Sequence, residues 1–341
     1  GKLPPTIFGH GHMKGTPEVP QDLVPEARPS KETFLVLPGT KDKMPQNGLG
    51  MCCRYSAYDD VLVRRTVLWY LMLGGRHIDG AHMYLNHEAI GLGIKDAMER
   101  GIPRKEIFVT TKISPYHFGY NATKDIVPTY VKELGLDYID LILMHAPVTF
   151  PTMSNECTKN KIPPKDCRQQ TWKALSELRK DGFVRNAGVS NFGIKHLKEI
   201  QEMSPDVVAP IANNQIQFSP FTPPHVADVV SYCHKHDITI TAYSSLGGTL
   251  QHAEAQTVET LTGLATKYDK SVAQVMLRWV MQSDSNAAVI PGTGNPKHMR
   301  ENLDIYSFDL SEQDKKAIDD LKHDEEAKKF FYVDPAEMPE S

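Results

Sequence analysis

The stretch RHIDGAHMY, residues 76–84, holds the feature around which the chain is organised: a short apolar strand that runs into a loop carrying an acid and a phenol. The strand is expected to end at Asp79, and Tyr84 follows in the loop. Two later stretches repeat this arrangement with other side chains, since IFVTTK ends at Lys112 and IDLILMH ends at His145. The second is almost continuously apolar, as in a strand buried on both faces of a parallel sheet.

Outward from these strands, short apolar runs alternate with segments of helical periodicity. Strands that alternate with helices pair in parallel, and eight such units favour a (β/α)8 TIM barrel over an open doubly wound sheet. The open alternative also lacks a Gly-x-Gly-x-x-Gly motif after its first strand. The predicted strands are 47–51, 77–79, 107–112, 139–145, 186–190, 212–217, 239–243 and 288–291. The predicted helices are 59–73, 87–100, 123–134, 168–180, 194–203, 224–236, 257–267, 271–282 and 297–303.

The ends of the chain differ in composition from its centre. We expect a loosely ordered extension over 1–32, a barrel domain over 33–310 that opens with a capping β-hairpin, and a tail or loop over 311–341. A polar insertion over 147–166 interrupts the alternation.

Charge and hydropathy exclude two classes of partner. The chain has 38 basic and 42 acidic residues, a balance that offers no electrostatic basis for binding nucleic acid. No apolar run approaches the roughly 20 residues that cross a bilayer, so no membrane association is expected. The five cysteines are too few for a disulfide scaffold. Cys157 and Cys167 flank a polar loop and could form a bridge, but we expect two free thiols of a cytoplasmic protein, with secretion left open.

Polar side chains recur at the predicted carboxyl ends of the strands, where the reactions of barrel enzymes take place. They are Asp79, Tyr84, Lys112, His145, Ser190, Gln215, Tyr243 and the loop that begins at Gly292. A phenol has a pKa near about 10, and a neighbouring ammonium lowers it. An acid paired with that ammonium would keep it charged, and an imidazole nearby can hydrogen-bond to the same substrate atom as the phenol. Such a phenol can protonate an oxygen as negative charge develops on it, which suits hydride delivery to a carbonyl carbon.

Each of these side chains also has an ordinary structural interpretation. Alone, Asp79 is a buried cap, Tyr84 a packed loop aromatic, Lys112 a surface strand end and His145 a core histidine. Their shared position on one rim is what favours function.

Hydride transfer requires a cofactor, and the later strands offer groups for one. GVSNF, residues 188–192, supplies Ser190 and Asn191, which can bind a carboxamide, and Gln215 supplies another amide. Tyr243 could stack on a flat ring. The loop IPGTGNP, residues 290–296, precedes a helix and suits a phosphate, although a plain turn with a helix cap explains it equally well.

Over about residues 33–305 these features resemble the aldo-keto reductase family. The motifs are HID (77–79) with Tyr84 and Asn86, GLDYIDL (135–141) running to His145, GVSNF, and SVAQVMLRW (271–279). The resemblance implies a barrel that binds NADP without a Rossmann domain, with Tyr84 as general acid, Asp79 and Lys112 tuning it, and His145 orienting the carbonyl. It also implies a set of cofactor-binding residues, namely Ser190, Asn191, Gln215, Tyr243, Ser244, Leu246, Thr293, His298 and Asn302.

The chain departs from the family pattern at several positions. Gly80 stands where many members have Thr or Ser, His87 where many have Glu, and Ala146 where Trp or Phe is usual. Gly292 takes the place of a Lys that many members use to hold the 2′-phosphate, and His298 takes the place of an Arg. Lys297 and Arg300 could replace the missing charge. NADP is therefore the expected cofactor, with NAD as the alternative.

The sequence predicts a monomeric, cytoplasmic, NADP-dependent aldo-keto reductase that reduces a small aldehyde or ketone and has no metal. A non-turnover redox sensor or partner-binding subunit on the same fold is the alternative. A metal-dependent barrel hydrolase is third, because no cluster of His and Asp side chains occupies the strand ends.

Overall fold

The computed structural model describes residues 15–23, 32–148, 154–205, 208–247 and 253–323. Its main sheet has eight parallel strands in the order β10-β9-β8-β7-β6-β5-β4-β3. The strands are β3 (Leu49–Gly50), β4 (His77–Asp79), β5 (Phe108–Ile113), β6 (Ile139–Met144), β7 (Val184–Ser190), β8 (Asn213–Gln217), β9 (Thr239–Tyr243) and β10 (Ala287–Val289). All eight predicted strands are present.

The sheet closes between its first and last strands. The Gly48 amide donates a hydrogen bond of 2.8 Å to the Val289 carbonyl, and the Val289 amide donates one of 2.7 Å to the Gln46 carbonyl. The strand segments between the helices therefore form the predicted (β/α)8 TIM barrel, with the carboxyl ends of the strands on one rim.

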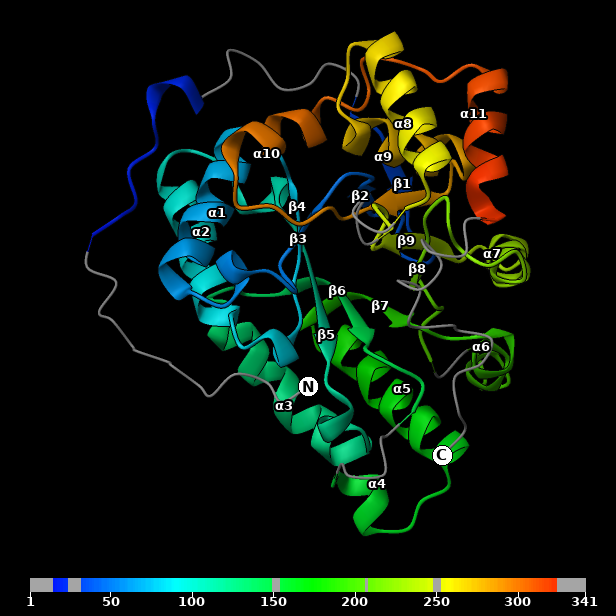
Figure 1. Cartoon of the computed structure of the whole chain (residues 1–341). Coiled ribbons are helices and arrows are strands. Elements are labelled where there is room, and N and C mark those ends of the chain that lie inside the picture. The colour runs from blue at the N-terminus through cyan, green and yellow to red at the C-terminus, as the bar shows by residue number, and fades with distance from the viewer. Residues whose placement is uncertain (1–14, 24–31, 149–153, 206–207, 248–252, 324–341) are drawn as a thin grey trace.

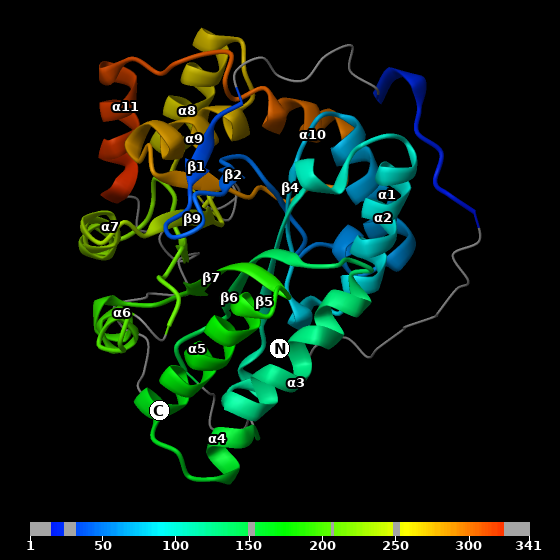
Figure 2. The ribbon, with the colours of Figure 1, turned by 180° about the vertical axis from the view of Figure 1, so that it is seen from behind.

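The N-terminal hairpin covers the opposite end of the barrel. β1 (Phe34–Val36) pairs antiparallel with β2 (Lys43–Pro45), and Figure 2 shows the two strands beside the barrel strands. Apolar side chains of the hairpin pack with inward-facing side chains of the barrel in one cluster: Leu35, Leu37, Met44, Phe108, Leu141, Leu143, Ala212 and Ala288. The hairpin thus removes the floor of the barrel from water, as predicted.

Helices connect the strands and cover the outside of the sheet (Figure 1). They are α1 (Asp60–Met72), α2 (His87–Glu99), α3 (Tyr120–Glu133), α4 (Glu156–Lys159), α5 (Pro164–Lys180), α6 (Ile194–Gln201), α7 (Val226–Lys235), α8 (Ala255–Tyr268), α9 (Val272–Ser283), α10 (Pro296–Leu303) and α11 (Glu312–Asp319). Polar side chains cap the amino ends of several helices. Asp59 accepts a hydrogen bond from the Leu62 amide at α1, and Ser271 and Gln274 form a capping box at α9.

Three segments differ from the expectation. The segment after residue 311, predicted as a tail or loop, begins with α11, whose N-cap is Ser311. Helix α5 starts four residues earlier than predicted, because Pro164 is tolerated in the first turn. In the extension over 1–32, residues 15–23 contact the barrel: the Trp69 indole donates a hydrogen bond of 2.9 Å to the Glu18 carbonyl, and Leu23 is buried. The other expectations for 1–14, 24–31 and 324–341 lie outside the described residues.

In the part of the chain that the structure describes, no helix is both long enough and apolar enough to cross a bilayer.

Candidate active site

A buried ion pair lies where β4 and β5 end. The Lys112 ammonium, 1% exposed, donates a hydrogen bond of 2.6 Å to Oδ1 of Asp79 and one of 2.8 Å to the Gly80 carbonyl. The amide of Gln215, at β8, donates a bond of 2.7 Å to the other oxygen of Asp79. Burial alone would lower the pKa of Lys112, but the charge of Asp79 and the neighbouring Tyr84 raise it above its usual value. The lysine is therefore held charged inside the rim.

Tyr84 lies beside the lysine of this pair. It belongs to a single 3-10 turn, His82–Tyr84, that follows β4. The Lys112 ammonium is 5.2 Å from the centre of the Tyr84 ring, and a side-chain hydrogen bond to Tyr84 contributes to the raised pKa of the lysine. The phenol also lines a cleft of about 400 Å³ at the rim.

His145 faces Tyr84 across this cleft. The two rings meet edge to face with centres 5.7 Å apart. Burial and the charge of Lys112 lower the pKa of His145 to about 3, so its imidazole is neutral at pH 7. Its Nδ1 is buried and has no hydrogen-bond partner among the described residues. His145 also lines the cleft, and a neutral imidazole can donate a hydrogen bond to a ligand there.

The three residues predicted to bind a carboxamide, and Tyr243, predicted to stack on a flat ring, meet around β7, β8 and β9. Ser190 Oγ donates a bond of 2.9 Å to the Gln215 carbonyl. Asn191, whose φ of 60° is left-handed, donates to the His145 carbonyl at 3.2 Å and accepts from the Tyr243 hydroxyl at 2.8 Å. The structure thus places all four predicted residues, with Ser244 and Leu246, in the same cleft as Asp79, Tyr84 and His145.

The residues predicted for the far end of the cofactor lie beyond this cleft. Thr293 is buried and accepts a bond from the Asn295 amide, while Asn302 is buried on α10. His298 is exposed on α10. None of the three is among the residues that line the cleft; they follow the rim past Gly292.

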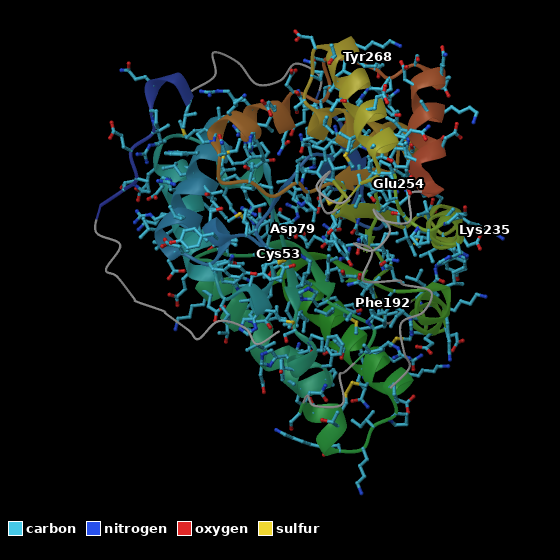
Figure 3. The ribbon with its side chains drawn as sticks, viewed as in Figure 1. Cys53, Asp79, Phe192, Lys235, Glu254 and Tyr268 are labelled. Carbon is cyan, nitrogen blue, oxygen red and sulfur yellow. A yellow bond between two sulfur atoms is a disulfide. The ribbon has the colours of Figure 1, made fainter. Side chains whose placement is uncertain are left out.

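Sequence reasoning missed the loop that follows β3. Cys52, Cys53 and Arg54 line the cleft together with Gly292 and Asp79, and Figure 3 labels Cys53 and Asp79 near the centre of the molecule. The two cysteines are bonded to each other. The rule that site residues follow the carboxyl ends of barrel strands applies equally to β3, and it would have found this loop.

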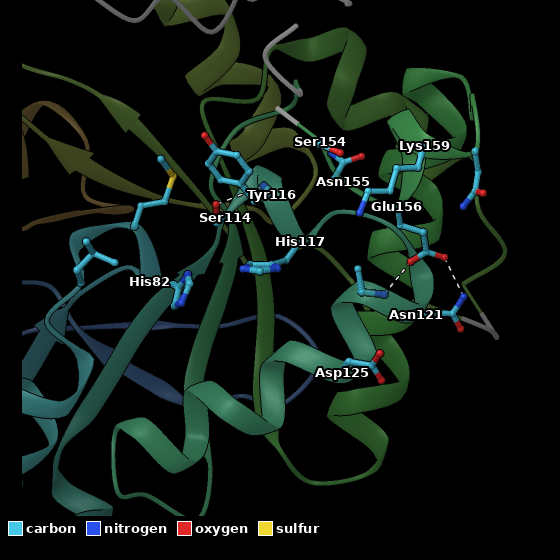
Figure 4. Close-up of a pocket in the computed structure, with 14 residues that line it drawn as sticks. His82, Ser114, Tyr116, His117, Asn121, Asp125, Ser154, Asn155, Glu156 and Lys159 are labelled. Atoms are coloured by element: carbon cyan, nitrogen blue, oxygen red, sulfur yellow. Dashed lines mark hydrogen bonds between the residues drawn. The ribbon is translucent and has the colours of Figure 1, made fainter. Parts of the chain in front are cut away.

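The insertion forms the wall of a second, more open hollow of about 990 Å³, shown in Figure 4. Its other side is formed by His82 and Met83, which precede Tyr84, and by the turn Pro115–His117. Glu156 ties the insertion to α3, because its carboxylate accepts bonds from the Asn121 side chain and the Ala122 amide.

The expectation of free thiols at Cys157 and Cys167 is wrong in the structure, where the two form a disulfide with their Cα atoms 5.7 Å apart. Cys157 lies on α4 and Cys167 in the first turn of α5, and α4 turns the chain back so that the two side chains meet. The remaining cysteine outside the cleft, Cys233, is free and buried.

Two further departures noted in the sequence have structural explanations. His87 donates or accepts at both ring nitrogens, with Glu133 at 3.0 Å and Thr111 at 2.7 Å, and so joins α2 to α3 and β5. A side chain at Gly80 would bring its Cβ within 3.2 Å of Ile90. Among the described residues no three His, Cys, Asp or Glu side chains are grouped so as to hold a metal ion.

A parallel eight-stranded barrel with charged and aromatic side chains gathered in a cleft at its carboxyl rim is the general architecture of a (β/α)8 barrel enzyme. The model of the Aldo/keto reductase family matches residues 48–323, and the chain belongs to that family.

The sequences of known proteins of this family align with most of the chain. It is 35% identical over 282 residues to the 9,11-endoperoxide prostaglandin H2 reductase of Trypanosoma cruzi, covering 83% of this chain and 89% of the relative. It is 35% identical to the glyoxal reductase of Bacillus subtilis, with coverage of 83% and 91%. Among solved structures, an aldo-keto reductase of Bombyx mori in complex with NADP has a TM-score of 0.74 at 30% identity, covering 85% of this chain and 93% of that one.

Proposed function

We propose that this protein reduces an aldehyde or ketone to an alcohol, with Tyr84 as the proton donor. The observation that carries the proposal is the chain of buried contacts from Gln215 through Asp79 to Lys112, which ends beside the Tyr84 phenol in an open cleft.

The roles follow from charge and position. Asp79 keeps the Lys112 ammonium charged and oriented. The ammonium favours negative charge on the Tyr84 oxygen, and so makes it easier for that oxygen to release its proton to a substrate oxygen on which charge is developing. The neutral imidazole of His145 can donate a hydrogen bond to the same substrate oxygen and orient the carbonyl.

The donor set in the cleft fits a dinucleotide. We assign the carboxamide to Ser190, Asn191 and Gln215 and the face of the nicotinamide ring to Tyr243, with Ser244 and Leu246 further along the rim. The adenosine end is assigned to Thr293, His298 and Asn302. A bound reduced nicotinamide supplies the hydride. NADP is favoured over NAD because the Bombyx mori neighbour was solved with NADP.

The substrate side is proposed to lie toward the hollow formed by the insertion, since His82 and Met83 connect it directly to Tyr84. Glyoxal is a suitable first probe because a Bacillus subtilis relative is named a glyoxal reductase. We keep a monomer and a cytoplasmic location as further proposals, which light scattering and fractionation of cells that express the protein would test.

The test compares the wild-type protein with Tyr84→Phe, which removes only the hydroxyl. NADPH binding is followed by fluorescence, and turnover of glyoxal and a panel of aldehydes and ketones by loss of absorbance of NADPH. We expect nearly unchanged binding and turnover reduced by at least ~100-fold. Undiminished turnover in Tyr84→Phe contradicts the assigned role. Binding without turnover of any carbonyl by the wild type supports the non-turnover sensor instead.

A further inference from the structure

Two adjacent cysteines on the wall of the cleft have no part in the proposed reaction. Cys52 and Cys53 follow β3 and are bonded to each other. Both line the cleft, together with Asp79 and Tyr84. Cys53 is exposed and Cys52 is half-buried. The bond between them is therefore within reach of a small reagent that enters the mouth of the cleft.

The other cysteines of the chain offer a direct comparison. Cys157 is 2% exposed and Cys167 is 3% exposed, and their bond joins α4 to the first turn of α5. The thiol of Cys233 is free and buried, and burial raises its pKa to about 12. Thiol–disulfide exchange requires access to the sulfur and a thiolate that can form, so the adjacent pair is the one best placed for it.

Arg54 places a positive charge next to this pair. Its Nη1 donates a hydrogen bond of 3.3 Å to the Cys52 carbonyl, and its Nε donates one of 3.0 Å to Ser56 Oγ. Burial lowers the pKa of Arg54 to about 10, so the guanidinium is still charged at pH 7. Exchange releases one of the two cysteines as a thiolate, and a neighbouring cation stabilises that leaving group.

The segment that carries the pair is fixed at both ends. The side-chain amide of Asn86 donates hydrogen bonds of 3.0 Å to the Met51 carbonyl and 3.0 Å to the Ala57 carbonyl. The Met51 amide donates one of 2.8 Å to the Asp79 carbonyl. Residues 52–56 therefore lie between two anchored points, and a change of conformation within them falls on the wall of the cleft.

The bond holds this segment in one conformation. Cys53 has a φ of 66°, in the left-handed region that residues other than glycine rarely adopt. The bond closes a small ring that includes the peptide unit between the two cysteines, and the ring restricts rotation on either side of that unit. Once the bond is reduced, Cys53 can return to a favoured conformation, and residues 52–56 lose their fixed shape.

We propose that Cys52 and Cys53 form a thiol–disulfide exchange site, and that its reduction loosens the cleft wall over residues 52–56. The co-reactant is a dithiol. One thiolate of the dithiol attacks the exposed Sγ of Cys53, the bond between the cysteines breaks, and Cys52 leaves as a thiolate that takes up a proton. The second thiolate of the reagent then attacks the reagent's own sulfur in the mixed disulfide, which releases Cys53 as a thiolate that is protonated and the reagent as a disulfide. Two electrons and two protons thus pass from the dithiol to the pair, and the reverse reaction restores the bond.

The oxidised form presents a cleft whose wall is already formed. A ligand that binds this form does not have to order residues 52–56, whereas a ligand of the reduced form does. Reduction should therefore weaken the binding of NADPH, the ligand assigned to this cleft. This effect on NADPH rests on the proposed function, whereas the exchange itself and the loosening of residues 52–56 do not.

The experiment titrates the folded protein, purified without reductant, with dithiothreitol at neutral pH. Free thiols are alkylated at each concentration and located by peptide mass spectrometry. Hydrogen exchange of the amides of residues 52–56 and the dissociation constant of NADPH are then measured on both forms after the reagent is removed. One variant is Cys52→Ser with Cys53→Ser, and the matched control is Cys157→Ser with Cys167→Ser, which removes the buried bond instead.

Cys52 and Cys53 are expected to be alkylated together, at a reductant concentration at least ~10-fold below the one that opens the bond between Cys157 and Cys167. Hydrogen exchange over residues 52–56 should become faster on reduction, and NADPH should bind about 3- to 10-fold more weakly. Cys52→Ser with Cys53→Ser should resemble the reduced wild type and show no response to the reductant. Cys157→Ser with Cys167→Ser should respond as the wild type does.

Three results would overturn the inference. Alkylation of Cys52 and Cys53 before reductant is added, or only together with Cys157 and Cys167, shows that the pair is not an exchange site. Unchanged hydrogen exchange over residues 52–56 after selective reduction, or equal NADPH binding by both forms, shows that the bond does not shape the wall. Failure of the oxidised protein to bind NADPH refutes the proposed function and the effect on NADPH, while alkylation and hydrogen exchange still decide the exchange site.

Discussion

The buried pair of Lys112 and Asp79 makes a prediction that does not depend on the proposed reaction. Lys112→Met keeps the length of the side chain but removes its charge. Among the described residues it leaves the Asp79 carboxylate, 2% exposed, with the Gln215 amide as its remaining side-chain partner. It also leaves the Gly80 carbonyl without its donor.

The magnitude follows from breaking a buried pair at one end. Removing one partner of such a pair typically costs about 3–5 kcal/mol, and the lost bond to Gly80 adds about 1 kcal/mol. We therefore expect the free energy of unfolding of Lys112→Met to fall by about 4 kcal/mol. Asp79→Asn should cost about as much, because it leaves the ammonium buried without a counter-charge.

The double variant Asp79→Asn with Lys112→Met tests the reasoning most directly. Both charges are absent, so its loss of stability should be smaller than the sum of the two single losses by about 2–3 kcal/mol. Urea unfolding followed by circular dichroism measures all four proteins. The matched control is Lys95→Met, whose lysine side chain is 69% exposed and 3.9 Å from Glu99; it should change stability by less than about 0.5 kcal/mol. Additive single losses, or a loss below about 1 kcal/mol in Lys112→Met, would refute the account of a coupled buried pair.

Two more predictions concern stability. Burial lowers the pKa of His77, which is fully buried, to about 4. Between pH 6.5 and 4 the unfolded chain therefore binds a proton at this residue that the folded chain does not. The free energy of unfolding should fall with decreasing pH in this range, by up to about 1.4 kcal/mol per pH unit from His77. His77→Gln should give a shallower slope in urea unfolding at pH 7 to 4.5, and exposed His236→Gln should not; an unchanged slope in His77→Gln contradicts this origin. Replacing Cys157 and Cys167 by serine opens a loop of sequence separation 10, which should lower the free energy of unfolding by about 3 kcal/mol. Wild type treated with a dithiol reductant should approach the same value, and a variant as stable as the oxidised wild type would show that the bond contributes nothing.

Alternation of apolar runs and helical periodicity was sufficient to predict the barrel, because a buried parallel strand must be apolar on both faces and must be followed by a covering helix. The same rule located Asp79, Lys112, His145, Ser190 and Gln215, since each lies at a strand end or within two residues of one, and all the parallel strands end on one rim. These features are local along the chain, so they are visible in the sequence.

Contacts between distant strands could not be predicted in this way. The bond from Gln215 to Asp79 spans 136 residues, and the close approach of Arg54 to Gly292 joins the first and last strands of the barrel. The pairing of Cys157 with Cys167 likewise depends on how α4 turns the chain. In each case the partner is set by closure of the barrel or by a turn in three dimensions. The sequence by itself therefore determined the strand ends and the residue types on the rim, whereas only the tertiary structure decided which of them meet, which is what sets their charge states.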